Sequence, residues 1–260
     1  MTSSLTAAGI TLAYGKRTIS SGLSLDIAPG SFTAIVGPNA SGKSTLLRAL
    51  ARLLAPREGQ VLLDGRDLAD HGSKELARML GLLPQTSIAP DGIRVADLVA
   101  RGRFPHQGAF DRWSARDEEA VASAMAATGV TELSGRLVDE LSGGQRQRVW
   151  VAMALAQQTG VLLLDEPTTF LDIAHQVTAL ELFRELNLGG HTLVAVLHDL
   201  NQAARYASHV VVMSDGAIVA HGAPADVITA DIIGRVFELP CRIISDPESG
   251  TPMVIPLVRR

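Results

Sequence analysis

The sequence predicts an α/β protein built on a mainly parallel sheet. Two continuous apolar runs, at 161–164 and 193–197, have the length and composition of central parallel strands that are covered on both faces. A glycine-rich loop at 37–44 joins a short apolar stretch at 32–36 to a segment of helical spacing at 45–52. The hydrophobic share is 47% but the aromatic share is only 4%, so Leu, Val, Ala and Ile must build the core.

The other elements follow from periodicity and turn residues. The first two strands alternate apolar and polar side chains, as half-exposed antiparallel strands do, and Asp64-Gly65 and Asp215-Gly216 are hairpin signals. Strands are expected at 10–14, 23–27, 32–36, 59–65, 81–85, 161–165, 191–197 and, as a hairpin, over 210–219. Helices are expected at 45–52, 73–80, 95–101, 114–128, 146–158, 178–186 and 201–207.

The middle of the chain differs from its two flanks. Residues from about 86 to about 158 carry little β signal, and Ser114 is a suitable N-cap for a helix whose first turn is acidic. We expect a helical subdomain there, inserted into a core that covers about 1–85 and 159–236. Residues 237–260 then form a C-terminal extension.

Composition and charge exclude several classes of protein. The 260 residues carry a net charge of −4, which disfavours a nucleic-acid-binding surface. Cys241 is the only cysteine, so no intrachain disulfide and no cysteine-based zinc site can form, as suits a reducing cytosol. The N-terminus lacks the pattern of a secretory signal. The apolar runs are far shorter than the roughly 20 residues that a membrane span needs, so any membrane role requires a partner.

The glycine-rich loop fits the phosphate-binding pattern G-x-x-x-x-G-K-[ST], and its strand–loop–helix context is the one that this pattern needs. Bare amides in the loop and at the helix N-terminus attract phosphate. Lys43 would reach the β- and γ-phosphates, and the Ser44 hydroxyl would ligate magnesium. The expected nucleotide-binding residues here are Gly37, Pro38, Asn39, Ala40, Ser41, Gly42, Lys43, Ser44 and Thr45.

Asp165 and Glu166 end the strand at 161–165. Beside a phosphate loop, the first acid can hold magnesium, and the second can orient or deprotonate the attacking water. The plainer interpretation is an ordinary strand-to-loop exit that happens to be acidic.

Ser142, Gly143, Gly144 and Gln145 follow Leu141 and open the helix predicted at 146–158. A hydroxyl and bare amides at a helix N-terminus form an anion site. A serine N-cap without function would produce the same residues. The pentapeptide, however, resembles the signature of the ATP-binding subunits of ABC transporters.

This resemblance covers essentially the whole chain, and its motifs occur in the family's order. It implies a RecA-like P-loop NTPase core with an antiparallel β patch and the inserted helical subdomain. It also implies ATP hydrolysis with ATP and Mg²⁺ in the site. Gln85 matches the glutamine that senses magnesium and the attacking water, so it is both a catalytic and a metal candidate.

Three further positions carry roles only through the resemblance. The segment 169–172 matches the loop that crosses the dimer interface, although it departs from the commoner S-A-L-D form, so Asp172 carries over better than its neighbours. His198 matches the histidine that contacts the γ-phosphate. Tyr14 sits where the family stacks an aromatic ring on adenine. Read alone, each is more simply a core or solvated residue.

The resemblance also implies the partners. Two subunits associate head to tail, and each ATP lies between one phosphate loop and the signature of the other subunit. This homodimer would serve a two-subunit integral membrane permease at the cytoplasmic face of the inner membrane, peripherally. A periplasmic or lipoprotein substrate-binding protein would be an indirect partner, and nucleic acid would not be one.

A narrower resemblance concerns the transported cargo. The segments 101–107, 171–176, 198–202 and 241–253 resemble importers of ferric siderophores, haem and cobalamin, and the last segment is most similar to the ferric-siderophore group. The implied function is ATP hydrolysis that drives ferric-siderophore import, with haem or cobalamin import as the alternative. A soluble ABC ATPase is disfavoured because the chain has one nucleotide domain and no coiled-coil insertion. A regulator without turnover is disfavoured by the presence of Glu166 and His198.

The permease is expected to dock on the helical subdomain. Pro90 and Gly92 suit a hinge in the loop that follows Gln85. Leu98, Val99 and Phe104 then offer apolar anchors for a permease helix. The alternative is that these side chains close the core of the subdomain itself. His106 and His175 lack partners at metal-ligand spacing and are expected to be solvated.

Overall fold

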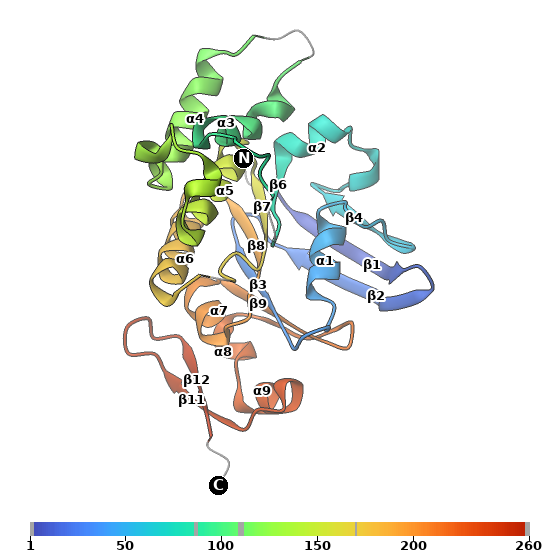
Figure 1. Cartoon of the computed structure of the whole chain (residues 1–260). Helices are drawn as coiled ribbons and strands as arrows, with labels where there is room; N and C mark the ends of the chain where they lie inside the picture. The colour runs from blue at the N-terminus through green and yellow to red at the C-terminus, as the bar shows by residue number, and fades with distance from the viewer. Residues whose placement is uncertain (1–2, 86–87, 109–111, 170, 258–260) are drawn as a thin grey trace.

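The computed structural model describes residues 3–85, 88–108, 112–169 and 171–257. Within them, a six-stranded sheet has the order β10-β9-β3-β8-β7-β6 (Figure 1). Strands β6, β7, β8, β3 and β9 run parallel, and β10 is antiparallel to β9. The bounds are β3 Phe32–Val36, β6 Leu80–Leu83, β7 Val161–Asp165, β8 Thr192–Val196, β9 His209–Ser214 and β10 Ala217–Gly222.

Successive residues of the parallel strands enter two different cores. Leu162 and Leu164 of β7 pack into one hydrophobic cluster, whereas Val161 and Leu163 pack into the other. Because side chains of a strand alternate between the faces of a sheet, both faces are covered. The predicted parallel sheet with continuous apolar strands is therefore confirmed.

The second sheet within the described residues has four strands, in the order β2-β1-β4-β5, and is antiparallel. The bounds are β1 Leu5–Tyr14, β2 Arg17–Ile27, β4 Glu58–Leu63 and β5 Arg66–Asp67. Asp64 and Gly65 turn β4 into β5 with φ of 51° and 80°, as the hairpin signal requires. The predicted antiparallel patch is confirmed, but β1 and β2 are longer than the expected strands at 10–14 and 23–27.

The helices up to residue 206 agree with the expected segments, with shifted ends, whereas the two helices between residues 224 and 237 were not predicted. Their bounds are α1 Lys43–Leu50, α2 Ser73–Met79, α3 Val95–Ala100, α4 Ala115–Ala127, α5 Gly143–Ala156, α6 Ile173–Leu188, α7 Leu200–Tyr206, α8 Pro224–Val227 and α9 Ala230–Phe237. Short 3₁₀ turns occupy Leu68–Asp70, Arg101–His106, Thr131–Leu133 and Val138–Glu140. Helices α5 and α6 begin three and five residues before the predicted starts at 146 and 178, because Ser142 and Asp172 are their N-caps.

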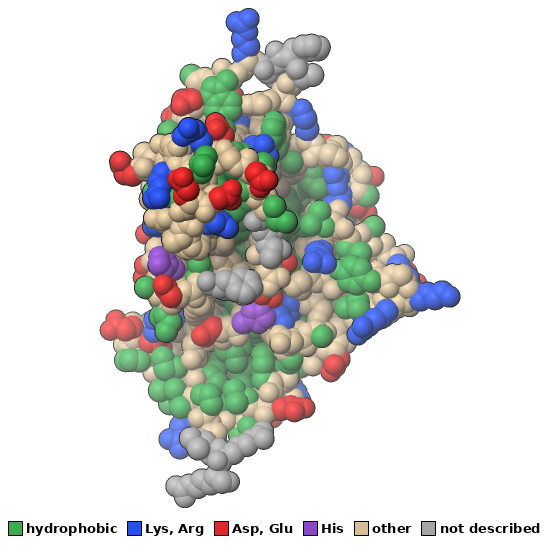
Figure 2. All heavy atoms as spheres, viewed as in Figure 1, with side chains coloured by type: hydrophobic (Ala, Val, Ile, Leu, Met, Phe, Trp, Pro, Cys, Tyr) green, Lys and Arg blue, Asp and Glu red, His purple; other side chains and the backbone are tan. Residues whose placement is uncertain are grey.

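Between β6 and β7, the described residues form helices and turns, which lie at the top of Figure 1. Ser114 caps α4 as expected. Leu98 and Val99 are buried in the main core, so the prediction that they are anchors for a permease is wrong, and they close the protein's own interior instead. Phe104 is 62% exposed and remains available. Acidic and basic side chains are interspersed over this region (Figure 2).

After β10, the chain forms α8 and α9 and then a separate two-stranded hairpin. Its strands are β11 Cys241–Ser245 and β12 Pro252–Pro256. The hairpin packs against α7, and Val254 joins the main core. This contact fixes the C-terminal segment to the molecule.

Candidate functional site

The glycine-rich loop runs from the end of β3 into α1. Gly37 has φ of 157°, and a Cβ there would lie 2.2 Å from the carbonyl oxygen of Met213, so no side chain fits. Ala40 and Gly42 also have positive φ, of 63° and 99°. Pro38 lies between these turns, Asn39 is exposed, and Thr45 is half-buried in α1. The loop thus folds back on itself with its backbone close to β9, in the form that surrounds a phosphate.

Lys43 is buried at the start of α1. Its Nζ donates hydrogen bonds to the carbonyl oxygens of Gly37 and Pro38, at 2.9 and 2.8 Å. Burial lowers the pKa of Lys43, while the charges of Glu166 and Asp165 oppose that shift. The Lys43 ammonium is therefore held by the loop carbonyls, at a position from which it can reorient toward a bound phosphate.

Asp165 is the last residue of β7 and is only 7% exposed. Burial raises its pKa, the Ser44 hydroxyl opposes this by a hydrogen bond, and the charge of Glu166 adds to the rise. Asp165 Oδ1 and the Ser41 hydroxyl have no hydrogen-bond partner among the described residues. The unpartnered Asp165 oxygen and the Ser44 hydroxyl beside this carboxylate form a donor set that fits a hard divalent cation.

Side chains from three segments of the chain contact the Glu166 carboxylate. His198 Nε2 lies 2.7 Å from its Oε1, Gln85 Nε2 donates to its Oε2, and the Thr169 hydroxyl donates to Oε2 over 3.1 Å. Gln85 follows β6 and His198 follows β8, so the carboxyl ends of neighbouring parallel strands bring them together. The structure thus joins Glu166, Gln85 and His198, which the sequence separates widely.

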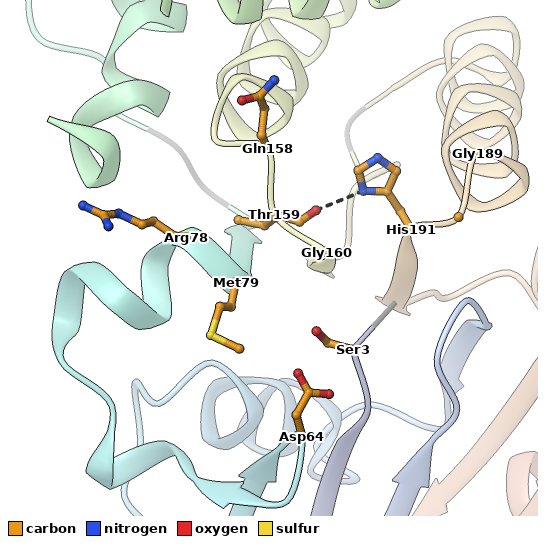
Figure 3. A pocket seen from close by; sticks show the side chains of 10 residues that line it. Ser3, Asp64, Arg78, Met79, Gln158, Thr159, Gly160, Gly189 and His191 are labelled. Atoms are coloured by element: carbon orange, nitrogen blue, oxygen red, sulfur yellow. Dashed lines mark hydrogen bonds between the residues drawn. The ribbon is translucent and has the colours of Figure 1, made fainter. Parts of the chain in front are cut away.

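A hollow of about 360 Å³ opens beside this cluster. It is lined by Arg48 of α1 together with Gln85 and Asp165, among others. A larger hollow, of about 770 Å³, lies elsewhere (Figure 3). It includes Gly160 and His191, which precede β7 and β8, so it opens at the other edge of the sheet and is not part of this cluster.

The predicted signature forms the N-terminus of α5. The Ser142 hydroxyl accepts from the Gln145 amide over 3.3 Å, and Gln145 Oε1 accepts from the Ser142 amide over 3.2 Å. Ser142 therefore acts as the N-cap of α5. Gly144 is buried, and a Cβ there would lie 2.4 Å from the ring of His175, so a larger residue would need that ring to move. Ser142 and Gly143 are exposed and face outward, so they can still contact another molecule.

Two candidates lie at the margin of the site. Asp172 caps α6, is exposed, and pairs with His175 Nδ1 at 2.6 Å. Tyr14 ends β1, is 44% exposed, and its hydroxyl accepts from Arg48 Nη1 over 3.2 Å. Of the other expected residues, Thr86 and Ser87 in the hinge and Phe170 lie outside the described residues.

Sequence reasoning missed two side chains. Arg48 contacts Tyr14 and contributes to the field at Asp165, and Thr169 contacts Glu166. The helical spacing of Arg48, one turn after Ser44, was the available signal for the first. His106 is not solvated as expected: its Nε2 lies 2.7 Å from the Gln157 carbonyl oxygen and it is half-buried.

Two features are absent from the described residues: a ready-made metal cluster and a membrane-spanning helix. These residues hold no cluster of three or more His, Cys, Asp or Glu side chains suited to a metal ion. None of their helices combines the length and the apolar character that a membrane span needs.

A family model described as "ABC transporter" matches residues 20–169, more than half of the chain. The Ferric enterobactin transport ATP-binding protein FepC of Escherichia coli (strain K12) is 57% identical over 251 residues, which are 96% of this chain and 93% of that protein. The chain belongs to the ABC transporter family. A Hemin import ATP-binding protein of this family, HmuV of Thermobifida fusca (strain YX), is 42% identical over 97% of this chain and 88% of that protein.

Solved structures of ABC proteins agree with this. A transporter assigned to the metal-chelate type, in an inward-facing conformation, matches with a TM-score of 0.85 and 28% identity, over 99% of this chain and 98% of that one. The dimeric bacterial ABC cassette MJ0796 matches with a TM-score of 0.75 and 27% identity, over 84% and 98%. The predicted α/β ABC ATPase fold is confirmed. As an ABC cassette, the chain binds ATP and is an ATPase, and cassettes of this kind dimerise.

Proposed function

We propose that this ABC ATPase hydrolyses ATP to drive import of a ferric siderophore through a membrane permease. The observation that carries the proposal is the 57% identity to FepC over nearly the full length of both chains. The hemin import relative is less similar, at 42%. Siderophore import is therefore favoured over the alternative of haem or cobalamin import.

We infer the catalytic roles from the cluster around Glu166. Its carboxylate is fixed by His198, Gln85 and Thr169, so it can accept a proton from a water held over the γ-phosphate. His198 and Gln85 would contact the phosphate and the water when nucleotide enters. Lys43 would leave the loop carbonyls and neutralise the β- and γ-phosphates.

Mg²⁺ is proposed to accompany ATP. Ser44 and Asp165 would hold it, with Gln85 beside them, and Asp165 Oδ1 is the oxygen left without a partner. A bound cation offsets the charge that develops on the transferred phosphoryl oxygens. Its charge would also remove the cost that burial imposes on the Asp165 carboxylate.

A head-to-tail homodimer would complete each site with the partner's Ser142, Gly143, Gly144 and Gln145. The exposure of Ser142 and Gly143 and of Asp172 supports this arrangement. The chain is predicted to divide into a core, a helical subdomain and a C-terminal extension. In this arrangement the helical subdomain would transmit the closing of the ATP-bound dimer to the permease. Phe104 and Ile88, 62% and 92% exposed, are two apolar side chains of this region that could contact the permease.

The proposed location is peripheral, on the cytoplasmic face of the inner membrane, with two permease subunits. A periplasmic or lipoprotein substrate-binding protein would deliver the cargo on the other side. The mixed acidic and basic surface in Figure 2 supports a protein partner rather than nucleic acid.

The ATPase roles are tested with Glu166→Gln. The variant keeps the shape of the side chain but cannot take the proton, so we expect ATP binding to persist and turnover to fall by about a hundredfold or more. Glu185→Gln, an exposed acid on α6, is the matched control and should leave turnover unchanged. Turnover of Glu166→Gln close to that of the parent protein would remove Glu166 from this role.

A further inference from the structure

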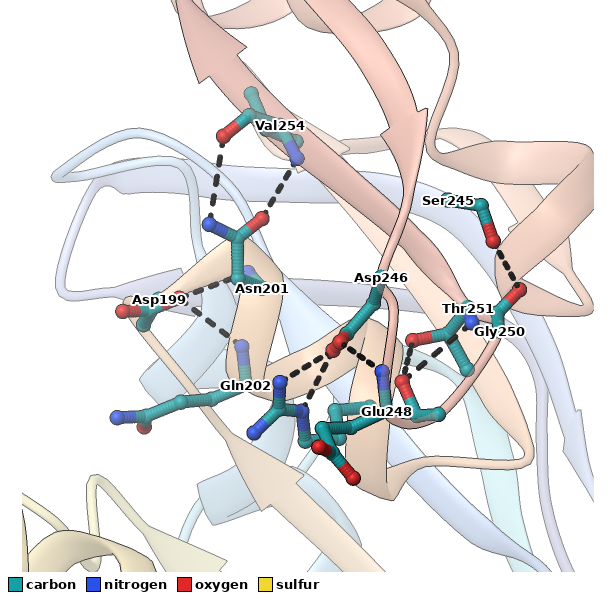
Figure 4. A network of polar contacts seen from close by, with 11 residues as sticks. Asp199, Asn201, Gln202, Ser245, Asp246, Glu248, Gly250, Thr251 and Val254 are labelled. Atoms are coloured by element: carbon teal, nitrogen blue, oxygen red, sulfur yellow. Dashed lines mark hydrogen bonds and ion pairs between the residues drawn. The ribbon is translucent and has the colours of Figure 1, made fainter.

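Helix α7 begins two residues after His198, with Asp199 as its N-cap between them. The strand before it is fixed, because the Leu197 amide donates to the Ile35 carbonyl oxygen of β3 over 3.1 Å. Asp199 then caps α7, accepting from the amides of Asn201 and Gln202 over 2.7 and 3.0 Å (Figure 4). The His198 side chain therefore leaves the backbone between a fixed strand end and the first turn of α7. Any shift of α7 moves that side chain relative to Glu166.

The C-terminal hairpin holds α7 at two points. Asn201 accepts from the Val254 amide over 2.7 Å and donates to the Val254 carbonyl oxygen over 3.4 Å, so it pairs with β12 as a strand residue would. One turn later, Arg205 donates from Nε over 2.8 Å, and from Nη2, to the Asp246 carboxylate. Figure 4 shows the contact between Asn201 and Val254, and Asp246 facing α7 from the hairpin.

The Asp246 carboxylate, which accepts from Arg205, is buried and held in place by a second hydrogen bond. It is only 4% exposed, and its other oxygen accepts from the Glu248 amide over 3.0 Å. The Glu248 amide and then the Arg205 guanidinium lower its pKa to about 2. Because Asp246 stays ionised near neutral pH, this contact is a permanent charge-assisted pair in a rigid turn. Solvent screens it only on the Arg205 side, which is 38% exposed.

A second contact holds α7 from the opposite direction. Gln202 Nε2 donates to Gln176 Oε1 of α6 over 2.8 Å, and Gln176 Nε2 donates to the Leu171 carbonyl oxygen over 2.9 Å. Leu171 belongs to the segment 169–172 that contains Thr169 and Asp172. Helix α7 is thus tied both to the hairpin and to the loop that contacts Glu166.

We propose that Asn201, Arg205 and Asp246 are positioning residues for His198, through which the C-terminal hairpin sets the geometry of the catalytic cluster. The three segments at 171–176, 198–202 and 241–253 that mark the narrower resemblance all meet at α7. The hairpin lies outside the nucleotide site, so its effect must pass through this helix. The inference rests on the proposed catalytic role of His198.

The test uses the full-length chain and measures kcat and KM for ATP, with single-turnover rates for slow variants. Asn201→Ala and Asp246→Ala should each lower kcat about fivefold to tenfold, as expected when one or two hydrogen bonds that hold a catalytic group are lost. KM should stay within about twofold. Arg242→Ala is the matched control, because this exposed arginine of β11 has no side-chain partner among the described residues and its loss should change nothing.

The deciding comparison is made in a His198→Ala background. If the hairpin acts through His198, Asn201→Ala should lower kcat no further there. Amide hydrogen exchange in 199–206 should accelerate in Asn201→Ala, while exchange in β3 stays unchanged. Arg205→Lys keeps the charge but loses the forked geometry, so it should fall between the parent and Asp246→Ala. It also replaces Asp246→Ala if that variant does not fold.

Two results would overturn the inference, and they differ from failure of the proposed function. An unchanged kcat in Asn201→Ala and Arg205→Lys, with only a lower melting temperature, would make the hairpin a stability element. If Asn201→Ala lowers kcat equally in the parent and in the His198→Ala background, the hairpin acts on a group other than His198. If His198→Ala itself keeps the parent's turnover, the proposed role of His198 is wrong and the inference falls with it.

Discussion

Two buried charged residues of the nucleotide site, Lys43 and Asp165, are only partly stabilised by the groups around them. Burial lowers the pKa of Lys43 and raises that of Asp165, so in both cases it disfavours the charged form. Other groups limit each shift: the charges of Glu166 and Asp165 for Lys43, and the Ser44 hydroxyl for Asp165. A triphosphate with its cation would supply the opposite charges. The site is therefore arranged for the ligand at some cost to the stability of the empty protein.

This cost predicts that Asp165→Asn stabilises the empty protein. Removing a buried, partly unpaired charge is worth on the order of 1 kcal/mol, which raises the melting temperature by about 2–4 °C for a chain of this size. The same variant should lose turnover, because it loses the carboxylate proposed for Mg²⁺.

The pH dependence of this gain has a definite sign. The pKa of Asp165 is raised in the folded state, so ionisation of this carboxyl costs folding free energy that first appears above the unfolded pKa and is complete above the folded one. The difference in melting temperature between variant and parent should be absent below the unfolded pKa and should grow as the pH rises through the folded one. Thermal unfolding at several pH values measures this, and equal melting temperatures at neutral pH would contradict it.

Elements in the helical region are joined by a buried ion pair that sequence patterns did not indicate. Arg103, 1% exposed, donates to Asp117 at the start of α4 over 2.8 Å and to the Ala156 carbonyl oxygen at the end of α5 over 2.7 Å. The Ser114 hydroxyl and then Arg103 lower the pKa of Asp117 to about 2. One guanidinium thus joins three helical segments of this region: the 3₁₀ turn at Arg101–His106, α4 and α5.

Arg103→Ala should destabilise the protein by about 3–5 kcal/mol, because it leaves the buried Asp117 carboxylate without its cation. Arg101→Ala, at an exposed neighbour without a side-chain partner among the described residues, is the matched control. Urea unfolding measures the difference. The contribution of Asp117 should be present above its unfolded pKa and should disappear as the pH falls toward 2. Equal stability of the two variants would show that the pair is not structural.

How far sequence reasoning reached depends on whether a feature is local. The phosphate loop, the strands and the N-cap at Ser114 were predicted because neighbouring residues determine them. The contacts of Arg205 with Asp246 and of Asn201 with Val254 join residues 41 and 53 positions apart, so no local pattern indicates them. For Leu98 and Val99 the sequence left both a permease contact and a core position open, because an apolar pair on a short helix has the same pattern whether it faces the core or a partner. The roles at Gln85 and His198 were available only through family resemblance.

At the scale of the whole molecule, the exposed signature predicts sites shared between two subunits. A dimer that combines one Ser142→Arg subunit with one Lys43→Ala subunit should have one site damaged twice and one site with both halves intact. The reason is that each site takes its phosphate loop and its signature from different chains.

Trapping of labelled nucleotide in the purified mixed dimer measures this, and it should detect a single competent site. Dimers that carry Ser142→Arg in both subunits are the control and should trap none. Equal damage at both sites of the mixed dimer would show that each signature serves the nucleotide of its own chain.

Uptake of radioactive iron by cells that lack this chain tests the central claim most directly. Cells supplied with the parent chain should take up iron presented as a ferric siderophore, and cells supplied with Glu166→Gln should not, although that variant still binds ATP. Cells supplied with Glu185→Gln should behave as the parent does. Uptake of siderophore iron that is equal with and without the chain, or equal with Glu166→Gln and the parent, would contradict the account.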